Sequence, residues 1–149
     1  MLDVIEHLND PEAFLEYIRS KVDVRGSEII ITTANIGFIS IRAGLLLGQF
    51  NYGKVGILDR THTRLFTFRS MRESLMQSGY EIVSMKGIPA PFPKAIGLNP
   101  LSRCLTKINE AAIRICPGLF SYQMLICAKI KPPLSALVAS TCKTTNTHA

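Results

Sequence analysis

Two acids and a histidine stand close together near the start of the chain, where their spacing could support chemistry. Asp3, Glu6 and His7 are spaced i, i+3, i+4, so a helical turn would project all three from one face. Two carboxylates and an imidazole could hold a divalent ion, or His7 could accept a proton from a substrate. The same residues also fit an exposed first helical turn, in which acids favour the helix N-terminus. The spacing leaves these alternatives open.

A second histidine lies in a polar cluster that is expected to form a loop. His62 is flanked by Arg60 and Arg64, whose charges favour the neutral imidazole that can act as a base. An ordinary surface histidine is the alternative. Asn35 directly follows an expected strand, and we favour a role in closing the turn over a hydrogen bond to a substrate. His148 lies in a polar tail and receives no role.

Three segments carry the signals of helices that would position these residues. An Asp-Pro pair predicts a helix over residues 11–22, with an N-cap and a proline at the first helical position. A second helix is predicted from Thr67 to Gly79. A third is predicted from Asn99 to Pro117, with its apolar residues on one stripe.

Three apolar segments read as strands. Residues 28–33 (EIIITT) are β-branched and apolar without alternation, which is typical of a strand buried on both faces. Residues 80–85 and 120–130 are also predicted strands, and they could pair antiparallel with the third helix packed over them. Residues 87–100 are rich in proline and glycine and are expected to form a loop.

Residues 36–50 form an apolar stretch interrupted by glycines. The stretch contains Arg42 and is shorter than the roughly 20 residues needed to span a bilayer. We expect it to belong to the core or to an interface. The alternatives are a lid over a substrate, or docking on a membrane surface with Arg42 reaching the polar region.

The net charge of +6 is unevenly distributed along the chain. Residues 1–35 hold seven acids and three bases, giving −4, and the remaining residues hold 14 bases and four acids, giving +10. An anionic partner is compatible with this asymmetry. The bases are nevertheless dispersed singly, so we expect solvated surface and no nucleic-acid partner. Four cysteines without a C-x-x-C pair, and a start without a signal-peptide pattern, indicate a cytoplasmic protein.

Four segments in order resemble class I S-adenosylmethionine-dependent methyltransferases. Asp3 to Pro11 resembles the D/E-x-x-E-H-L-x-D-P segment that follows the family's fourth strand, and residues 28–37 are similar to its fifth strand. Residues 60–67 resemble an R-x-H-x-R-x-F-T segment, and residues 116–123 resemble a P-x-L-F-x-Y-Q segment before the final strand. The resemblance covers about residues 2–131. It is to bacterial small-molecule methyltransferases, some of them fused to glycosyltransferases.

The resemblance implies an α/β fold, the C-terminal half of a Rossmann-like sheet with strands in the order 5-7-6 and helices on both faces. The strand over 120–130 would be central and antiparallel to both others. Residues 1–138 would form a partial methyltransferase domain and residues 139–149 a polar tail. The family's first three strands and its G-x-G-x-G cofactor loop would lie upstream. We therefore expect the isolated chain neither to bind S-adenosylmethionine nor to be active.

The resemblance also implies methyl transfer from S-adenosylmethionine to a small-molecule or lipid-linked acceptor. His7 and His62 would be catalytic on the acceptor side, and Asp3 and Glu6 would bind the cofactor at the carboxyl ends of the strands. No residue is assigned to a metal, although a similar E-x-x-E-H cluster in ubiquinone-biosynthesis O-methyltransferases is associated with one.

The implied partners follow from the incomplete sheet. The strand over 28–33 would have an exposed edge, which predicts pairing with an N-terminal half or self-association. A membrane surface stays open as a further partner. The alternative function is a non-enzymatic interaction module, or an inactive methyltransferase fragment that pairs with a partner chain.

Overall fold

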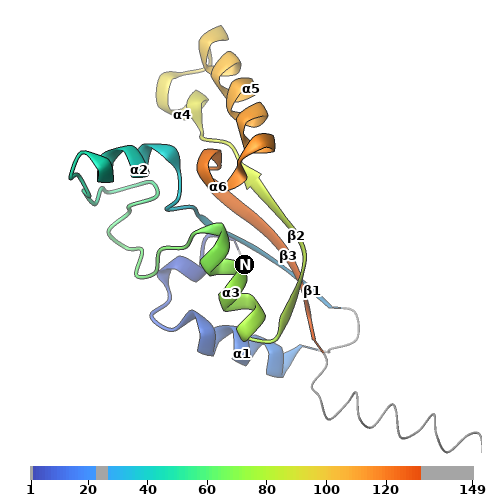
Figure 1. Ribbon diagram of the computed structural model, residues 1–149. Helices are drawn as coiled ribbons and strands as arrows, with labels where there is room; N and C mark the ends of the chain where they lie inside the picture. The colour runs from blue at the N-terminus through green and yellow to red at the C-terminus, as the bar shows by residue number, and fades with distance from the viewer. Residues whose placement is uncertain (1, 23–26, 132–149) are drawn as a thin grey trace, which may run out of the picture.

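A three-stranded sheet forms the centre of the computed structural model, which describes residues 2–22 and 27–131. Its strands are β1 (Glu28–Ala34), β2 (Tyr80–Ile88) and β3 (Gln123–Ile130), in the order β1-β3-β2. β3 is central and antiparallel to both neighbours (Figure 1). The predicted α/β class and strand order are therefore confirmed. The predicted tail over 139–149 lies outside the described residues.

The core lies on one face of this sheet. Alternate residues of β3 are buried there, and they pack with residues of the N-terminal turn and of two helices; the set includes Met124, Ile126, Ala128, Ile130, Ile5, Leu15, Met71 and Leu75. On the opposite face, Ile30 is 53% exposed and Val83 is 50% exposed. The prediction that residues 28–33 are buried on both faces is thus wrong for the start of the strand. The described residues cover that part of the sheet on one face only.

Two helices cover the core face, and both begin as predicted. α1 (Pro11–Lys21) is capped by Asp10, whose carboxylate accepts a 2.8 Å hydrogen bond from the Ala13 N–H. α3 (Phe68–Gln77) begins with a capping box between Thr67 and Ser70. The buried Tyr80 hydroxyl donates a 2.7 Å bond to the Leu15 carbonyl and so ties β2 to α1.

The first residues of the chain pair with the outer edge of β1. Leu2 forms a parallel bridge with Thr32, and the Asp3 N–H donates to the Thr32 carbonyl at 3.1 Å. The short 3-10 helix η1 (Ile5–His7) follows directly. Because the pairing is parallel, it carries the turn from Asp3 to His7 to the carboxyl end of β1.

The second half of the chain adds three helices beyond the end of β2 (Figure 1). The predicted loop over 87–100 contains the helix α4 (Phe92–Ile96). α5 (Pro100–Ile115) begins at Asn99 as predicted, but its buried residues are Ser102 and Asn109. The predicted strand start at residue 120 is wrong, because α6 (Pro117–Phe120) forms first: Pro117 occupies its initial position.

The apolar stretch over 36–50 projects from the fold. It contains α2 (Ile39–Leu46), and none of the helix residues is buried. The part of the prediction that placed this segment in the core is therefore wrong. Among the described helices, none combines the length and the hydrophobicity that crossing a membrane requires.

Candidate functional site

A cavity of about 470 Å³ opens beside the carboxyl end of β1. The N-terminal turn contributes Asp3, Glu6 and His7 to its wall, and the loop before α3 contributes His62. The structure thus brings all four predicted site residues to one place, although His62 is far from the others in sequence.

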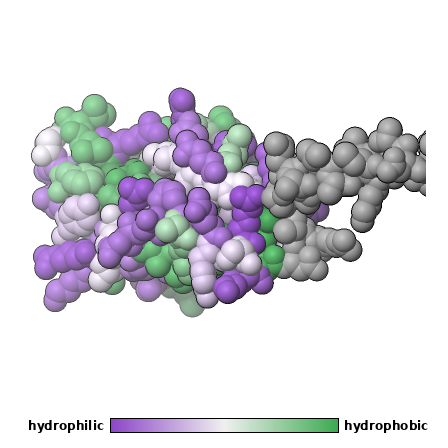
Figure 2. All heavy atoms as spheres, turned by 90° about the horizontal axis from the view of Figure 1, so that it is seen from below, coloured by the Kyte–Doolittle hydropathy of each residue, from purple (hydrophilic) through white to green (hydrophobic). Residues whose placement is uncertain are grey.

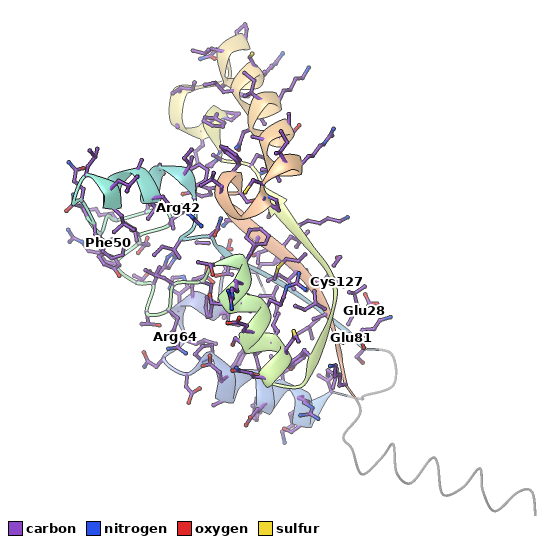
Figure 3. All side chains as sticks on the ribbon, viewed as in Figure 1. Glu28, Arg42, Phe50, Arg64, Glu81 and Cys127 are labelled. Carbon is purple, nitrogen blue, oxygen red and sulfur yellow. The ribbon has the colours of Figure 1, made fainter. Side chains whose placement is uncertain are left out.

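The loop that carries His62 is fastened to the N-terminal turn by backbone hydrogen bonds. The N–H groups of Thr63 and Arg64 donate to the Glu6 carbonyl at 2.8 and 3.1 Å. Thr63 Oγ1 also donates to the Leu8 carbonyl at 2.7 Å. Arg64 itself turns away from the cavity to form a 3.0 Å ion pair with Glu12 on α1 (Figure 3). These contacts fix the loop against η1.

The two histidine rings meet edge to face, with centroids 4.9 Å apart and an interplanar angle of 72°. His7 Nδ1 lies 3.0 Å from the Thr61 carbonyl oxygen, and His62 Nδ1 lies 2.9 Å from the Ile57 carbonyl oxygen. A carbonyl oxygen can only accept, so each Nδ1 carries its hydrogen when the ring is neutral. The lone pair of each neutral imidazole is therefore on Nε2.

Glu6 supplies a carboxylate to the same pair. Its side chain is 2% exposed, and its Oε2 is buried without a hydrogen-bond partner among the described residues. One ligand atom each from Glu6, His7 and His62 lie within 4.8 Å of one another. A buried polar atom without a partner is costly, and a bound ion or water is one way to satisfy it.

Asp59 organises the turn that presents the histidines. Its Oδ1 accepts 2.8 Å hydrogen bonds from both the N–H and the hydroxyl of Thr61. These bonds, first the backbone one, hold the pKa of Asp59 below its usual value, and the nearby His62 and His7 lower it further. A carboxylate at this position adds negative charge to the wall of the cavity.

Asp3 is tied to the sheet. It is the one non-glycine residue with a positive φ, 49°, among the described residues. Its Oδ1 accepts hydrogen bonds from Thr32 Oγ1 at 2.9 Å and from Gln123 Nε2 at 3.2 Å. The left-handed conformation costs roughly 1–2 kcal/mol, which these bonds help to offset. Its predicted role in cofactor binding stays a prediction.

Tyr122 is a site residue that the sequence analysis did not assign. It lines the cavity, and its ring packs edge to face on Phe38 with centroids 5.7 Å apart. Burial raises the pKa of its phenol, so the hydroxyl stays protonated at neutral pH. Gly56 has φ +101°, and a Cβ there would lie 3.2 Å from the Tyr122 hydroxyl.

Two further outcomes concern the sequence predictions. Asn35 closes the turn after β1, as favoured: its Oδ1 accepts from the Gly37 N–H, and its Nδ2 donates to the Ser121 carbonyl. The backbone carbonyls of Thr61 and Ile57, which accept hydrogen bonds from the two Nδ1 atoms, could not be predicted from sequence, because every residue has a carbonyl. The Asp59-x-Thr61 pattern before His62 is a turn signal that could have pointed to the geometry of this loop.

The arrangement is of the kind that binds a divalent cation. Two imidazole nitrogens and one carboxylate are a common donor set for divalent transition metals. Metal-ligating histidines usually donate their other ring N–H to a carbonyl or carboxylate, as both do here. The sequence analysis assigned no metal ligand, whereas the geometry offers Glu6, His7 and His62 as a fitting set. The same two Nε2 atoms could instead accept a proton.

The comparisons with known proteins support the fold. No protein-family model matches the sequence, and no curated protein matches it. Among solved structures, the fold is similar to the crystal structure of the small RNA methyltransferase HEN1, with a TM-score of 0.52 and 16% sequence identity. The match covers 89% of this chain and 13% of that chain. The chain therefore has a methyltransferase-like α/β fold and spans a small part of the protein that it resembles.

Proposed function

We propose that this chain forms the acceptor side of an S-adenosylmethionine-dependent methyltransferase, in which Glu6, His7 and His62 hold a divalent cation. The observation that carries the proposal is the convergence of these three side chains at the carboxyl end of a methyltransferase-like sheet. Open α/β sheets bind ligands at that edge. A non-enzymatic interaction module explains the fold equally well but gives no reason for two histidines held by their Nδ1 atoms.

The residues of the site would divide the work of the reaction. Methyl transfer is an in-line displacement at the sulfonium, so the protein must align the two substrates and remove the proton of the acceptor. A bound divalent cation would lower the pKa of an acceptor hydroxyl group. Tyr122, protonated at neutral pH, would donate a hydrogen bond to the acceptor from the wall of the same cavity.

The described residues offer only part of a cofactor site. They contain no glycine-rich turn from a strand into a helix, and the carboxylate of Glu6 belongs to the histidine cluster. Asp3 and Asp59 are the described carboxylates of the cavity wall that remain, and Asp3 is the one beside the sheet. We therefore propose that the glycine-rich half of the site is contributed by additional polypeptide, as a preceding segment or a second chain.

The acceptor is proposed to be a small molecule or a lipid-linked molecule in the cytoplasm. The structural neighbour HEN1 is a small RNA methyltransferase, so a small RNA is the alternative acceptor that a direct assay must separate. The cavity of about 470 Å³ is large enough for a single sugar- or ring-sized group.

The test is transfer of labelled methyl groups by a complex of this chain with a polypeptide that supplies the glycine-rich half. Acceptors would be a lipid extract, a metabolite pool and a short RNA. His7→Ala and His62→Ala should each lower turnover by about 100-fold or more, with little change in the affinity for S-adenosylmethionine. His148→Ala is the matched control, because that residue lies in the polar tail.

Two outcomes would contradict the proposal. If the two substitutions lowered cofactor affinity as much as turnover, the histidines would not act on the acceptor side. Full activity in the presence of a strong chelator, after prior removal of metal, would exclude the cation from the reaction.

A further inference from the structure

Two segments expose an unusual amount of aliphatic surface: α2 with the loop that follows it, and the stretch from α4 to α5. In the first segment, the end of α2 and the loop that follows it are open to solvent: Leu46 is 88% exposed and Val55 is 83% exposed. In the second segment, Leu98 before α5 is 83% exposed. Val55, which follows α2, and Lys94, in α4, both line the cavity, so each segment reaches its wall.

The exposed surface of α5 is a continuous stripe. Leu101, Ile108 and Ile115 are seven residues apart and therefore share one face of the helix. All three are more than half exposed, whereas the helix packs inward through Ser102 and Asn109. α5 thus buries polar side chains and turns its apolar stripe to solvent. The Ser102 hydroxyl donates to the Asn99 carbonyl, and Asn109 Nδ2 donates to the Phe120 carbonyl.

Both segments are free of acidic residues over long stretches. Residues 36–58 and 82–109 contain no aspartate or glutamate, but they contain Arg42, Lys54, Lys86, Lys94, Arg103 and Lys107. Glu28 and Glu81 lie at the far end of the sheet from α5 (Figure 3). α5 itself carries one acid, Glu110, against the three bases Arg103, Lys107 and Arg114. The exposed aliphatic side chains therefore lie on segments in which basic residues outnumber acidic ones.

The two segments also lie at the same end of the fold, opposite α1 (Figure 1). Figure 2 shows hydrophobic side chains gathered at the end of the molecule where Figure 1 places α2. Phe50, on the loop that follows α2, also points outward at this end (Figure 3). We call this region the docking surface; it comprises Leu45, Leu46, Leu47, Phe50, Val55, Leu98, Leu101, Ile108 and Ile115.

We propose that the docking surface binds membranes that contain anionic phospholipid. Helices that lie in the membrane interface combine an exposed apolar face with lysine and arginine on the flanking polar face, as α5 does with Arg103 and Lys107. Anionic headgroups attract each basic residue near the surface, and the basic residues of these segments outnumber their one acid, Glu110. The membrane would then lie close to the candidate site, because Val55 belongs both to the docking surface and to the cavity wall.

The chemistry of the surface favours lipid over the other occupants. Single-stranded nucleic acid is bound by open aromatic platforms, but Phe50 and Tyr52 contact each other edge to face with centroids 5.5 Å apart. Leucine, isoleucine and valine offer nothing to a phosphate backbone. A second copy of this chain would bring the same basic residues together, and like charges repel.

The test is co-sedimentation of the full chain with two kinds of lipid vesicle. One kind contains phosphatidylcholine alone, and the other contains equal parts of phosphatidylcholine and phosphatidylglycerol. We expect binding to the anionic vesicles that weakens with salt, and little binding to the neutral ones. Because each basic residue near an anionic surface is worth about 1 kcal/mol, or roughly fivefold in affinity, Arg103→Gln with Lys107→Gln should weaken binding about 25-fold.

Charged substitutions test the apolar part of the surface. Leu46→Glu and Ile108→Glu should each lower vesicle binding by at least about tenfold, since burial of a leucine-sized side chain is lost and repulsion is added. Tyr17→Glu is the matched control, because Tyr17 is 60% exposed on α1 at the other end of the molecule. All three positions are solvent-exposed, so the thermal midpoint in solution should not change.

Several results would overturn the proposal. These are absence of vesicle binding, equal binding to neutral and anionic vesicles, and unchanged binding of Leu46→Glu and Ile108→Glu. A dimer that these two substitutions dissociate, without vesicle binding, would identify a second copy as the occupant. Binding of a short single-stranded RNA in place of vesicles would identify a nucleic acid.

Discussion

Replacement of Glu6 by glutamine separates the cost of a buried carboxylate from its use as a ligand. Glu6 Oε2 is buried and has no hydrogen-bond partner within the described part of the chain. An unsatisfied buried polar atom costs about 1–3 kcal/mol. Glu6→Gln removes the charge but keeps the shape and an amide that also needs partners. A buried charge without a partner costs more than a buried amide without one, so we expect Glu6→Gln to raise the free energy of unfolding without metal by about 1 kcal/mol.

The stabilisation that a bound cation provides should be smaller in Glu6→Gln than in the wild type. A ligand at a hundred times its dissociation constant stabilises the folded state by about 2.7 kcal/mol. For a domain of this size, 1 kcal/mol corresponds to roughly 4 °C, so Mn²⁺ should raise the Tm of the wild type by about 10 °C. Glu6→Gln should lose most of that rise, because one of three ligands is gone.

Thermal unfolding followed with and without Mn²⁺ is the assay. Mn²⁺ is preferable to Zn²⁺, because the exposed thiols of Cys104 and Cys116 could bind zinc independently. Glu16→Gln is the control, since Glu16 is an exposed residue of α1. An equal rise in Tm for wild type and Glu6→Gln, or no rise in the wild type, would refute the cation site.

Two further predictions concern the packing of β2. A Cβ at Gly87 would overlap Ser121 Oγ and come within 2.8 Å of Ile113 Cγ2. Gly87→Ala should therefore lower the free energy of unfolding by about 1–3 kcal/mol, as measured by urea titration. Gly118→Ala is the control, because a Cβ there meets open space. Tyr80→Phe removes the buried bond to the Leu15 carbonyl and should cost about 1–2 kcal/mol. Burial raises the pKa of Tyr80 in the folded state above its unfolded value of about 10. The protonated hydroxyl therefore stabilises the fold fully below about pH 10, and this stabilisation is lost as pH rises through the folded pKa. Urea titrations at several pH values should therefore show that Tyr80→Phe loses less stability above about pH 10 than the wild type does.

The helix starts could be predicted because their signals are local. Asp10, Thr67 and Asn99 each accept a hydrogen bond from the backbone N–H three residues on, a contact that depends on neighbouring residues alone. The start of β3 could not be placed from apolar character, because apolar residues 117–120 serve α6 as well as a strand. The predicted burial of the apolar residues of α2 and α5 was wrong for a related reason. A periodic apolar pattern shows that a face exists but not what covers it.

The candidate site was predicted in its residues but not in its geometry. Asp3, Glu6 and His7 could be grouped from their spacing, and His62 from its motif. Their meeting depends on the bonds from Thr63 and Arg64 to the Glu6 carbonyl, which bridge more than fifty positions. Tyr122 was likewise missed, because its position in the cavity follows from the register of β3 against β1 rather than from its neighbours in sequence.

The edge of β1 leads to the final prediction, that the isolated chain self-associates. Leu2 already pairs with Thr32 in parallel, so this edge accepts a parallel strand. The sheet face beside this edge carries Ile30 and Val83, whose side chains are both half exposed, and exposed apolar side chains of this kind favour contact with another chain. Light scattering should show association that increases with concentration and that Ile30→Lys reduces, whereas Tyr17→Lys on α1 does not. Co-expression with a polypeptide that supplies the missing parallel strands should give a soluble one-to-one complex instead. A stable monomer of the lone chain at all concentrations would show that this edge is already protected.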